Sequence, residues 1–189
     1  MYKQRCAWVP TDKPYYMQYH DEEWGIPVYD DHKLFEMLTL EGAQAGLSWD
    51  TVLKKRAGYS AAFHKFDPQM CAAMSDAVLK DLMHHQGIIR NFFKIRSVRN
   101  NAIVYGRIQK EFGSFSTYVW AFVGGCPLVN TWRNSAQVPA STPLSEKLSK
   151  DLKQRGMTFV GPTIMYAFMQ AVGLVNDHTT DCFCRQQSV

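Results

Sequence analysis

The order of apolar and polar positions predicts a chain of medium-length helices joined by short turns. Leu34, Leu38 and Glu41 follow the i, i+4, i+7 spacing of one helix face, so the run from Asp31 onward is predicted to be helical. A second helix is expected after Ser48, whose hydroxyl suits the cap position before WDTVLKKRAGYSAAF. The first of these helices carries a single carboxylate, Glu41, on its apolar face, followed only by the small or uncharged residues GAQAG.

Proline, serine and glycine indicate the ends of the middle helices. Pro68 is expected in the first turn of a short helix, and Ser75 as the cap of DAVLKDLMHHQ. Gly87 is expected to end that helix in the left-handed conformation. The longest amphipathic run, NFFKIRSVRNNAIVYGRIQKEFG, follows directly after the short turn GIIR. The middle of the chain is therefore predicted to hold two helices joined by a tight turn.

The last third of the chain shows the same pattern. Thr142 and Pro143 precede the run PLSEKLSKDLKQRG, which Gly156 ends, and Gly161 precedes the apolar run PTIMYAFMQAVGLV. Strand-forming stretches are short, and Thr158–Val160 is the longest of them. The predicted fold class is all-α, in a single domain that spans residues 1–189.

Composition narrows the class of protein without identifying a function. Hydrophobic residues make up 46% of the chain and charged residues 20%, which is typical of a soluble globular protein. We find neither the ~20 apolar residues of a membrane helix nor a signal-peptide core, so a cytoplasmic location away from membranes is expected. The five cysteines are an odd number, which argues against a disulfide framework. The net charge of +4 is compatible with a polyanionic partner.

Cysteine and histidine residues occur near both ends of the chain. Cys6 and His20 lie near the start, and His178 and Cys182 near the end, where the H-x3-C spacing predicts one helix face. Two cysteines and two histidines have the composition of a closed, structural zinc site. The spacing alone leaves open that these residues are ordinary thiols and surface histidines, or that Cys184 replaces Cys182.

A glycine-containing turn and several early aromatic residues suit a nucleic acid. The turn HHQGIIR precedes a helix, and consecutive backbone N–H groups at a helix start attract phosphate. Arg90 and Lys94 would add charge and a salt-sensitive contact. Aromatic residues near the N-terminus could stack a flat ligand. The ordinary interpretations, a solvated connection between helices and core packing, stay open for each feature taken alone.

Six strings stand out along the chain: CAWV, YHDEEWGIPV, LFEMLTLEGAQAGLSW, VLKKR, GIIRN and FVGPTIMYAFMQAVGLVNDH. Together they resemble the DNA-3-methyladenine glycosylase I family of the helix-hairpin-helix glycosylase superfamily. The resemblance implies an all-α, two-lobed body, with one lobe formed by the N- and C-terminal segments and the other by the central helices. It also implies a structural Zn²⁺ that joins the two ends of the chain. The implied ligands are Cys6, His20, His178 and Cys182.

The same resemblance implies a function. The protein is expected to be a monomeric and monofunctional enzyme that removes 3-methyladenine from double-stranded alkylated DNA in base-excision repair. Glu41 matches the carboxylate that recognises the base and is the predicted catalytic residue, and Leu47 matches the wedge that enters the DNA. The implied base-binding residues are Trp8, Tyr16, Tyr19, Trp24, Glu41 and Trp49. The implied DNA-binding hairpin residues are Gly87, Ile88, Ile89 and Arg90.

The chemistry of the expected substrate agrees with these residues. A base inside a duplex must be flipped out before a protein can enclose it. An adenine methylated at N3 is cationic, so its glycosidic bond is weakened and its ring is attracted to aromatic faces. The Glu41 carboxylate would accept a hydrogen bond from the exocyclic amine. Two other functions fit the same residues: a non-enzymatic reader of alkylated DNA, and a zinc-stabilised helical scaffold.

Overall fold

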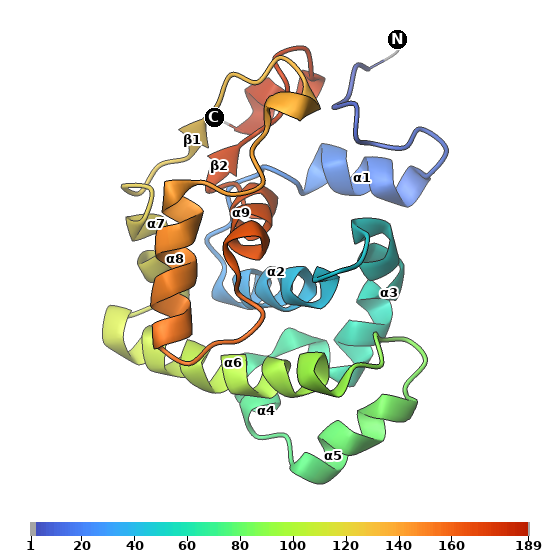
Figure 1. Ribbon diagram of the computed structural model, residues 1–189, viewed down its shortest axis with the longest axis vertical. Coiled ribbons are helices and arrows are strands. Elements are labelled where there is room, and N and C mark those ends of the chain that lie inside the picture. Colours follow the sequence, from blue (N-terminus) through green and yellow to red (C-terminus); the bar gives the residue numbers. More distant parts are fainter. Residues whose placement is uncertain (1–2, 189) are drawn as a thin grey trace.

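The computed structural model describes residues 3–188 and is mainly helical (Figure 1). The helices are α1 (Pro14–Glu22), α2 (Asp31–Gln44), α3 (Trp49–Ala62), α4 (Pro68–Ala72), α5 (Asp76–Asp81), α6 (Phe92–Phe112), α7 (Phe115–Ala121), α8 (Pro143–Gln154) and α9 (Pro162–Ala171). The 3-10 turns are η1 (His64–Phe66), η2 (Leu82–His84), η3 (Ser135–Gln137) and η4 (Phe183–Ser188), and the strands are β1 (Leu128–Val129) and β2 (Val175–Asn176). Within the described residues, no helix combines the length and apolar character needed to cross a membrane.

Side-chain caps fix where most of the long helices begin. Asp30, Ser48, Ser75, Asn91 and Thr142 each accept a hydrogen bond from a backbone N–H in the first turn of the helix that follows. Such a cap stabilises a helix by about 1 kcal/mol. Proline occupies the first turn of α4, α8 and α9. A backbone N–H at this position has no partner within the helix, so proline removes no hydrogen bond there. The predicted helix starts at Ser48, Ser75 and Thr142 are confirmed.

The fold is mainly α rather than strictly all-α. Strands β1 and β2 pair in parallel, with Leu128 opposite Val175, and the sequence did not predict either strand. The expected strand stretch, Thr158–Val160, is irregular instead. The side-chain amide of Asn101 in α6 donates to the backbone carbonyl of Thr158 and accepts from its N–H, both at 2.9 Å. These bonds use backbone groups of Thr158 that a neighbouring strand would otherwise use.

The prediction that Gly87 ends a helix in the left-handed conformation is wrong. Gly87 does not have a positive φ, and α5 ends earlier, at Asp81, followed by the 3-10 turn η2. Gly87 instead lies against Gly58 of α3: a Cβ added to Gly58 would lie 2.7 Å from the Gly87 Cα. Glycine is therefore needed here because two backbones approach closely.

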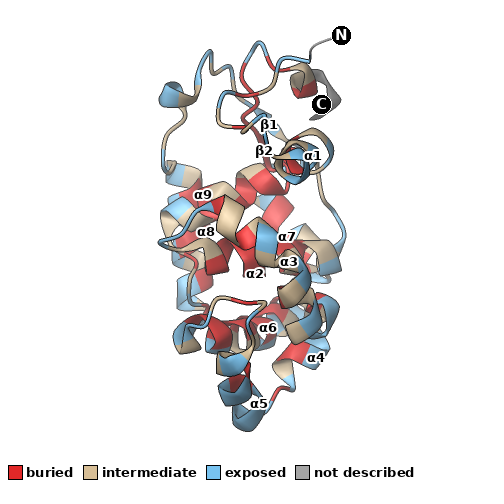
Figure 2. Ribbon diagram, turned by 90° about the vertical axis from the view of Figure 1, so that its right-hand side faces the viewer, coloured by how far each residue is buried: buried red, intermediate tan, exposed pale blue. Residues whose placement is uncertain are grey.

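Helix α2 lies at the centre of the molecule, and α3, α6, α7 and α9 pack around it. Leu34, Phe35 and Leu40 of α2 are completely buried, and much of the ribbon around α2 in Figure 2 has the red colour of buried residues. Helix α1 and the C-terminal segment lie at one end of the molecule, and α4 and α5 lie at the other. A backbone hydrogen bond from Phe183 to Gln4 joins the two ends of the chain.

Candidate functional site

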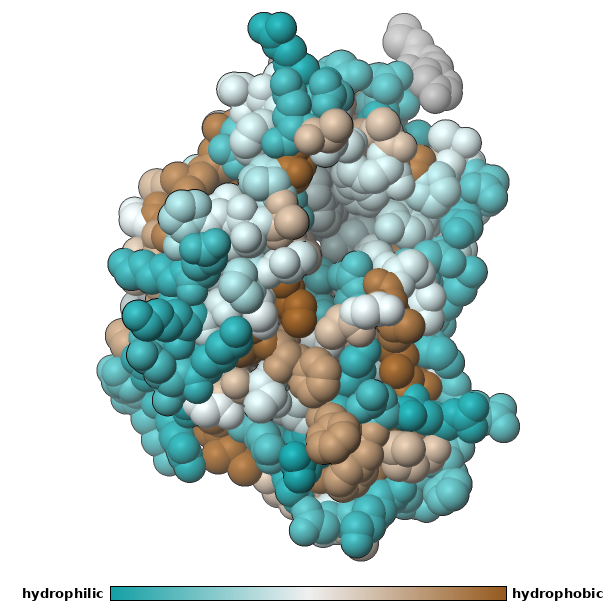
Figure 3. Space-filling view, in the orientation of Figure 1, coloured by the Kyte–Doolittle hydropathy of each residue, from teal (hydrophilic) through white to brown (hydrophobic). Residues whose placement is uncertain are grey.

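A cavity of about 330 Å³ opens beside the C-terminal half of α2. Figure 3 shows the hollow on the surface, lined by side chains of intermediate hydropathy. The structure brings together at this cavity all of the residues predicted to bind the base, which come from the N-terminal segment, α1, α2, α3 and the connection after α1. These residues are Trp8, Tyr16, Tyr19, Trp24, Glu41 and Trp49.

Five of the residues that line the cavity are aromatic. Trp8 contacts Trp24 and Tyr16 edge to face, with ring centroids 4.8 and 5.9 Å apart. Tyr19 lies 5.1 Å from Trp49 in a tilted arrangement. Burial, together with nearby acidic groups, raises the pKa of Tyr16 to about 12, so its phenol keeps its proton at neutral pH. The wall therefore offers ring faces and edges suited to a flat cation.

Glu41 is one of the two acidic residues in this wall, the other being Asp177, and it is only 3% exposed. Its Oε2 atom has no hydrogen-bond partner among the described residues. Burial raises the pKa of Glu41 from its ordinary value of 4.5 to about 8, because the apolar surroundings penalise the charged form. In the ligand-free cavity Glu41 is therefore mainly a neutral carboxylic acid at pH 7.

Two further polar atoms beside the cavity lack partners. Within the described residues, the buried side-chain atoms without a hydrogen bond are Glu41 Oε2, Trp49 Nε1 and Ser135 Oγ, and all three residues line this one cavity. An unpaired buried polar group costs about 1–3 kcal/mol. Such a concentration indicates a site completed by a ligand that carries both donors and acceptors.

The turn between α2 and α3 lies at the edge of this cavity. Gly46 has a φ of 73°, and the N–H of Leu47 donates to the carbonyl of Gln44 at 2.7 Å. Leu47 is 41% exposed, and its role as a wedge stays a prediction. A second cavity, of about 340 Å³, shares Glu41 and Gln44 with the first and extends to Leu47 and the start of α9. The base cavity thus continues towards the exposed turn.

Residues 85–91, called the hairpin below, join η2 to α6. The N–H groups of Gly87, Ile88 and Ile89 are not free for phosphate, because they donate to the His85 ring, the His85 carbonyl and the Tyr59 hydroxyl. These three bonds hold the hairpin against itself and against α3. These three N–H groups are therefore occupied, and phosphate binding by N–H groups at the start of α6 stays a prediction.

Side chains of the same segment divide between core and solvent. Ile88 is 1% exposed and belongs to the core, whereas Arg90 is exposed. Lys94, expected as a second surface cation, is buried, and its ammonium donates to backbone carbonyls of α2 and the following turn. Of the two cations predicted here, Arg90 is thus the one that lies at the surface.

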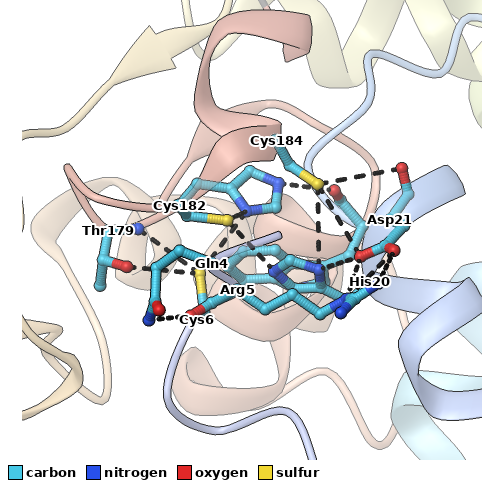
Figure 4. A network of polar contacts seen from close by, with 10 residues as sticks. Gln4, Arg5, Cys6, His20, Asp21, Thr179, Cys182 and Cys184 are labelled. Atoms are coloured by element: carbon cyan, nitrogen blue, oxygen red, sulfur yellow. Dashed lines mark hydrogen bonds and ion pairs between the residues drawn. The ribbon is translucent and has the colours of Figure 1, made fainter. Parts of the chain in front are cut away.

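The four predicted metal ligands converge, although they come from the two ends of the chain (Figure 4). Cys6, His20, His178 and Cys182 are all buried, and their ligand atoms lie within 4.8 Å of one another. Cys182 Sγ lies 3.5 Å from His20 Nε2 and 3.4 Å from His178 Nδ1, and Cys6 Sγ lies 3.6 Å from His178 Nδ1. Ligands around a tetrahedral Zn²⁺ would be separated by about 3.5 Å for an S–N pair, so the donor set fits.

The reason for this convergence differs from the prediction. His178 and Cys182 do not share a helix face: His178 lies outside any helix, and a turn follows Thr179, whose carbonyl accepts from the Cys182 N–H. Cys184 lies to one side, 3.9 Å from His20 Nδ1, and is not among the four converging ligands. Of the two alternatives, the structure therefore groups Cys182 with the other three residues.

The outer nitrogens of both histidines are held by the protein. Nε2 of His178 donates to the carbonyl of Trp24 at 3.1 Å, and Nδ1 of His20 lies 2.8 Å from a carboxylate oxygen of Asp21. Arg5 donates to both oxygens of Asp21 in turn. Partners of this kind fix the ring orientation of metal-binding histidines.

The sequence did not identify every residue of the cavity wall, and Asp177 and Ser135 are two of those it missed. Asp177 accepts from Asn130 Nδ2, Trp132 Nε1, Tyr166 Oη and Gln170 Nε2 at 2.5–2.8 Å, so its buried carboxylate is fully satisfied. Its position beside His178 was the available signal for Asp177. Ser135 lies in η3, in a region without a recognised motif, and only the folded chain brings it to the cavity.

Comparison with known proteins agrees with this geometry. A family model described as methyladenine glycosylase matches residues 8–185. The chain is 50% identical over 181 residues to DNA-3-methyladenine glycosylase 1 of Escherichia coli (strain K12), which covers 96% of each chain. A crystal structure of 3-methyladenine DNA glycosylase I is similar, with a TM-score of 0.93 and 51% identity over 96% of this chain and 99% of that one.

A third relative connects the fold to ligand recognition. A structure concerning 3-methyladenine recognition by the glycosylase I of Staphylococcus aureus has a TM-score of 0.93 and 37% identity, over 96% of each chain. Near-complete coverage in every comparison means that the likeness includes both the central helices and the two ends. The family resemblance of the six sequence strings is confirmed, and the chain belongs to the methyladenine glycosylase family.

Proposed function

We propose that the protein is a monofunctional DNA glycosylase that hydrolyses the N-glycosidic bond of 3-methyladenine in double-stranded alkylated DNA, acting as a monomer. The observation that carries the proposal is the aromatic cavity in which Glu41, Trp49 and Ser135 all present unpartnered polar atoms. The activity named for its relatives supports the same substrate. A flipped base would enter this cavity past the turn that carries Leu47.

The polar atoms of the cavity suit the edges of adenine. The exocyclic amine is a donor and finds an acceptor in Glu41, whereas N1 and N7 are acceptors. Trp49 Nε1 can only donate, and the Ser135 hydroxyl can donate or accept. A bound base would therefore satisfy each of the three atoms that lack a partner in its absence.

The positive charge of the methylated base would let the cavity select it over undamaged adenine. In the free cavity burial keeps Glu41 mainly protonated, with a pKa of about 8. A cationic base replaces the missing positive partner, so the carboxyl group loses its proton and the resulting ion pair is stable in the apolar cavity. Neutral adenine offers the amine without the charge, and ring faces attract it less strongly.

The bond cleavage follows from the charge of the base. The electron pair of the glycosidic bond moves to the base, which leaves as neutral 3-methyladenine, and the sugar becomes an oxocarbenium-like cation. Water adds to C1′ and loses a proton, which completes the hydrolysis. Glu41 holds the base while this occurs. Within the described residues that line the cavity there is no lysine that could form an imine with the sugar, which supports hydrolysis without a lyase step.

The DNA itself is proposed to lie across the exposed turn and the hairpin. Leu47 would fill the gap left by the flipped base, and Arg90 would contact the backbone beside the start of α6. The N- and C-terminal segments would form one lobe of a single domain, and the central helices the other. The cavity, lined from both parts of the chain, would lie between them.

A structural Zn²⁺ is proposed at Cys6, His20, His178 and Cys182. With four protein ligands the site is closed, so the ion would hold the two ends of the chain together and take no part in hydrolysis. The spacing of the ligand atoms and the second hydrogen bond of each histidine support this assignment.

Release of bases from methylated DNA, analysed by chromatography, tests the proposed function. We expect the wild type to release 3-methyladenine and Glu41→Gln to release it at least tenfold more slowly. Binding to abasic DNA serves as a control, because it needs no base in the cavity. Intact binding to methylated DNA without any release would favour a non-enzymatic reader, and a silent Glu41→Gln variant would favour a scaffold.

A further inference from the structure

Lys94 occupies an unusual position for a lysine. It lies in the first turn of α6, yet the residue is only 9% exposed, because its side chain passes inward to the C-terminal end of α2. Its Nζ atom donates to the carbonyl of Ala43 at 2.8 Å and to the carbonyl of Ala45 at 2.6 Å. The two oxygens lie at the end of α2, where carbonyls lack helical partners.

The local energetics of α6 do not favour a lysine there. A cation in the first turn is repelled by the dipole of its own helix, and burial disfavours the charged form, which lowers the pKa of Lys94. Within the described residues, none of the ion pairs includes Lys94. The compensation comes from the two carbonyls and from the negative end of the α2 dipole.

Those carbonyls belong to the segment between the base site and the wedge. Ala43 follows Glu41 by two residues, and Ala45 precedes Leu47 by two. The segment holds two glycines and two alanines, so its own side chains restrict it little. The ammonium of Lys94 gives it a fixed point of attachment.

The other end of Lys94 is fixed to the hairpin. Its backbone N–H donates to Oδ1 of Asn91, the residue that caps α6 and ends the hairpin connection. A single residue therefore links the segment that is proposed to grip DNA with the segment that is proposed to enter it.

We propose that Lys94 is a positioning residue that holds the turn carrying Leu47 in register with the hairpin and α6, so that DNA bound by the hairpin meets both the wedge and Glu41. The inference rests on the proposed excision from duplex DNA. Lys94 is not among the residues that line either cavity at Glu41, so it acts through the turn and not on the base.

The test compares Lys94→Met, Lys94→Arg and Lys110→Met. Methionine keeps the length and removes the N–H groups, arginine keeps donors for the carbonyls, and Lys110 is an exposed lysine near the other end of α6. For each variant, single-turnover release of 3-methyladenine from duplex DNA is measured beside the affinity for the free base and for a duplex with an abasic analogue. Salt dependence of duplex binding is measured as well.

For Lys94→Met we expect at least tenfold slower release and weaker binding to the abasic duplex. Its affinity for free 3-methyladenine should stay within about twofold, because the cavity is intact. Lys94→Arg should recover part of the rate, and Lys110→Met should match the wild type. The slope of log affinity against log salt should not change, because no phosphate contact is removed.

Three results would overturn the inference. If Lys94→Met released 3-methyladenine at the wild-type rate, the turn that carries Leu47 would not need Lys94 to hold it in place. An equal loss of free-base affinity would show that Lys94 maintains the whole fold instead of positioning the turn. A salt slope lower by about one would indicate a direct phosphate contact. Failure of the proposed function is distinguishable, because the wild type itself would then release no 3-methyladenine.

Discussion

Gly58 in α3 and Gly87 in the hairpin lie so close that neither has room for a side chain. A Cβ on Gly58 would lie 2.7 Å from the Gly87 Cα, and one on Gly87 would lie 3.1 Å from the Gly58 Cα. The contact fixes where the hairpin sits relative to α3 and hence to Trp49 at the start of that helix. The position of the proposed DNA-binding turn thus depends on glycine at both positions, because even the methyl side chain of alanine would push the two segments apart.

Gly58→Ala is expected to destabilise the protein by on the order of 2 kcal/mol, because the backbone of Gly87 must move. Its affinity for DNA should fall as the hairpin shifts. The control is Gly106→Ala in α6, where an added Cβ meets nothing within 4 Å and helix propensity favours alanine by about 1 kcal/mol. Denaturant unfolding of both variants checks the prediction, and equal stability of the two would contradict it.

Glu41→Gln is expected to change how stability depends on pH. The pKa of Glu41 is about 8 in the folded protein and near 4.5 in the unfolded chain. Its contribution to the free energy of unfolding is therefore fully present below pH 4.5 and is lost as the pH rises towards 8, because the unfolded chain then releases the proton more readily. Glutamine cannot ionise, so the variant should gain on the order of 3 kcal/mol relative to the wild type between pH 5 and pH 8. Urea unfolding at these two pH values measures the difference. Parallel pH curves for the two proteins would refute the assigned pKa.

Removal of the metal is expected to lower the thermal stability of the whole chain, because the ion would hold both termini together. Cys182→Ser should abolish stoichiometric zinc, whereas Cys184→Ser should keep it, since Cys184 lies outside the four converging ligands. Zinc content by mass spectrometry and melting temperature with and without chelator provide the measurement. If Cys184→Ser lost zinc and Cys182→Ser kept it, Cys184 would be the ligand in place of Cys182.

Ser135→Ala is expected to lower the affinity for free 3-methyladenine by about two- to tenfold, the usual effect of one lost neutral hydrogen bond. The folded protein loses no hydrogen bond of its own, because Ser135 Oγ has no partner among the described residues. Stability should therefore stay level or rise slightly. Ser135→Thr keeps the hydroxyl and provides the control. Titration calorimetry with the free base measures the affinity of each variant. If Ser135→Ala bound the base as tightly as the wild type, Ser135 would not belong to the recognition site.

Local rules recovered most of the secondary structure but not how its parts meet. Caps at Ser48, Ser75 and Thr142 act within one turn of helix, so sequence spacing contains the necessary information. The two-residue strands β1 and β2 lie far apart in the chain, and their short pairing has no periodic signature. Gly87 shows the same limit, because its neighbour Gly58 is distant in sequence.

The candidate site was predictable to the extent that its residues belong to distinctive strings. Glu41 stood out because an acid on an apolar helix face is unusual, and the family resemblance supplied its companions. Ser135 carried no such signal, because it lies outside the six strings. Asp177 lies inside the last of them, but the string alone does not show that Asn130 and Trp132, from a distant part of the chain, donate to its carboxylate. Lys94 looked like a surface cation because helix periodicity does not reveal which carbonyls a long side chain reaches.

The histidine rings of the metal centre pack directly against the tryptophans of the base cavity. His178 lies 4.7 Å from Trp24, and His20 lies 5.2 Å from Trp8, both edge to face. The proposed ion and the proposed base would therefore both contact this one group of rings. Oxidation of the two cysteines, or binding of a larger metal, would alter the shape of the cavity as well as the junction between the two ends of the chain.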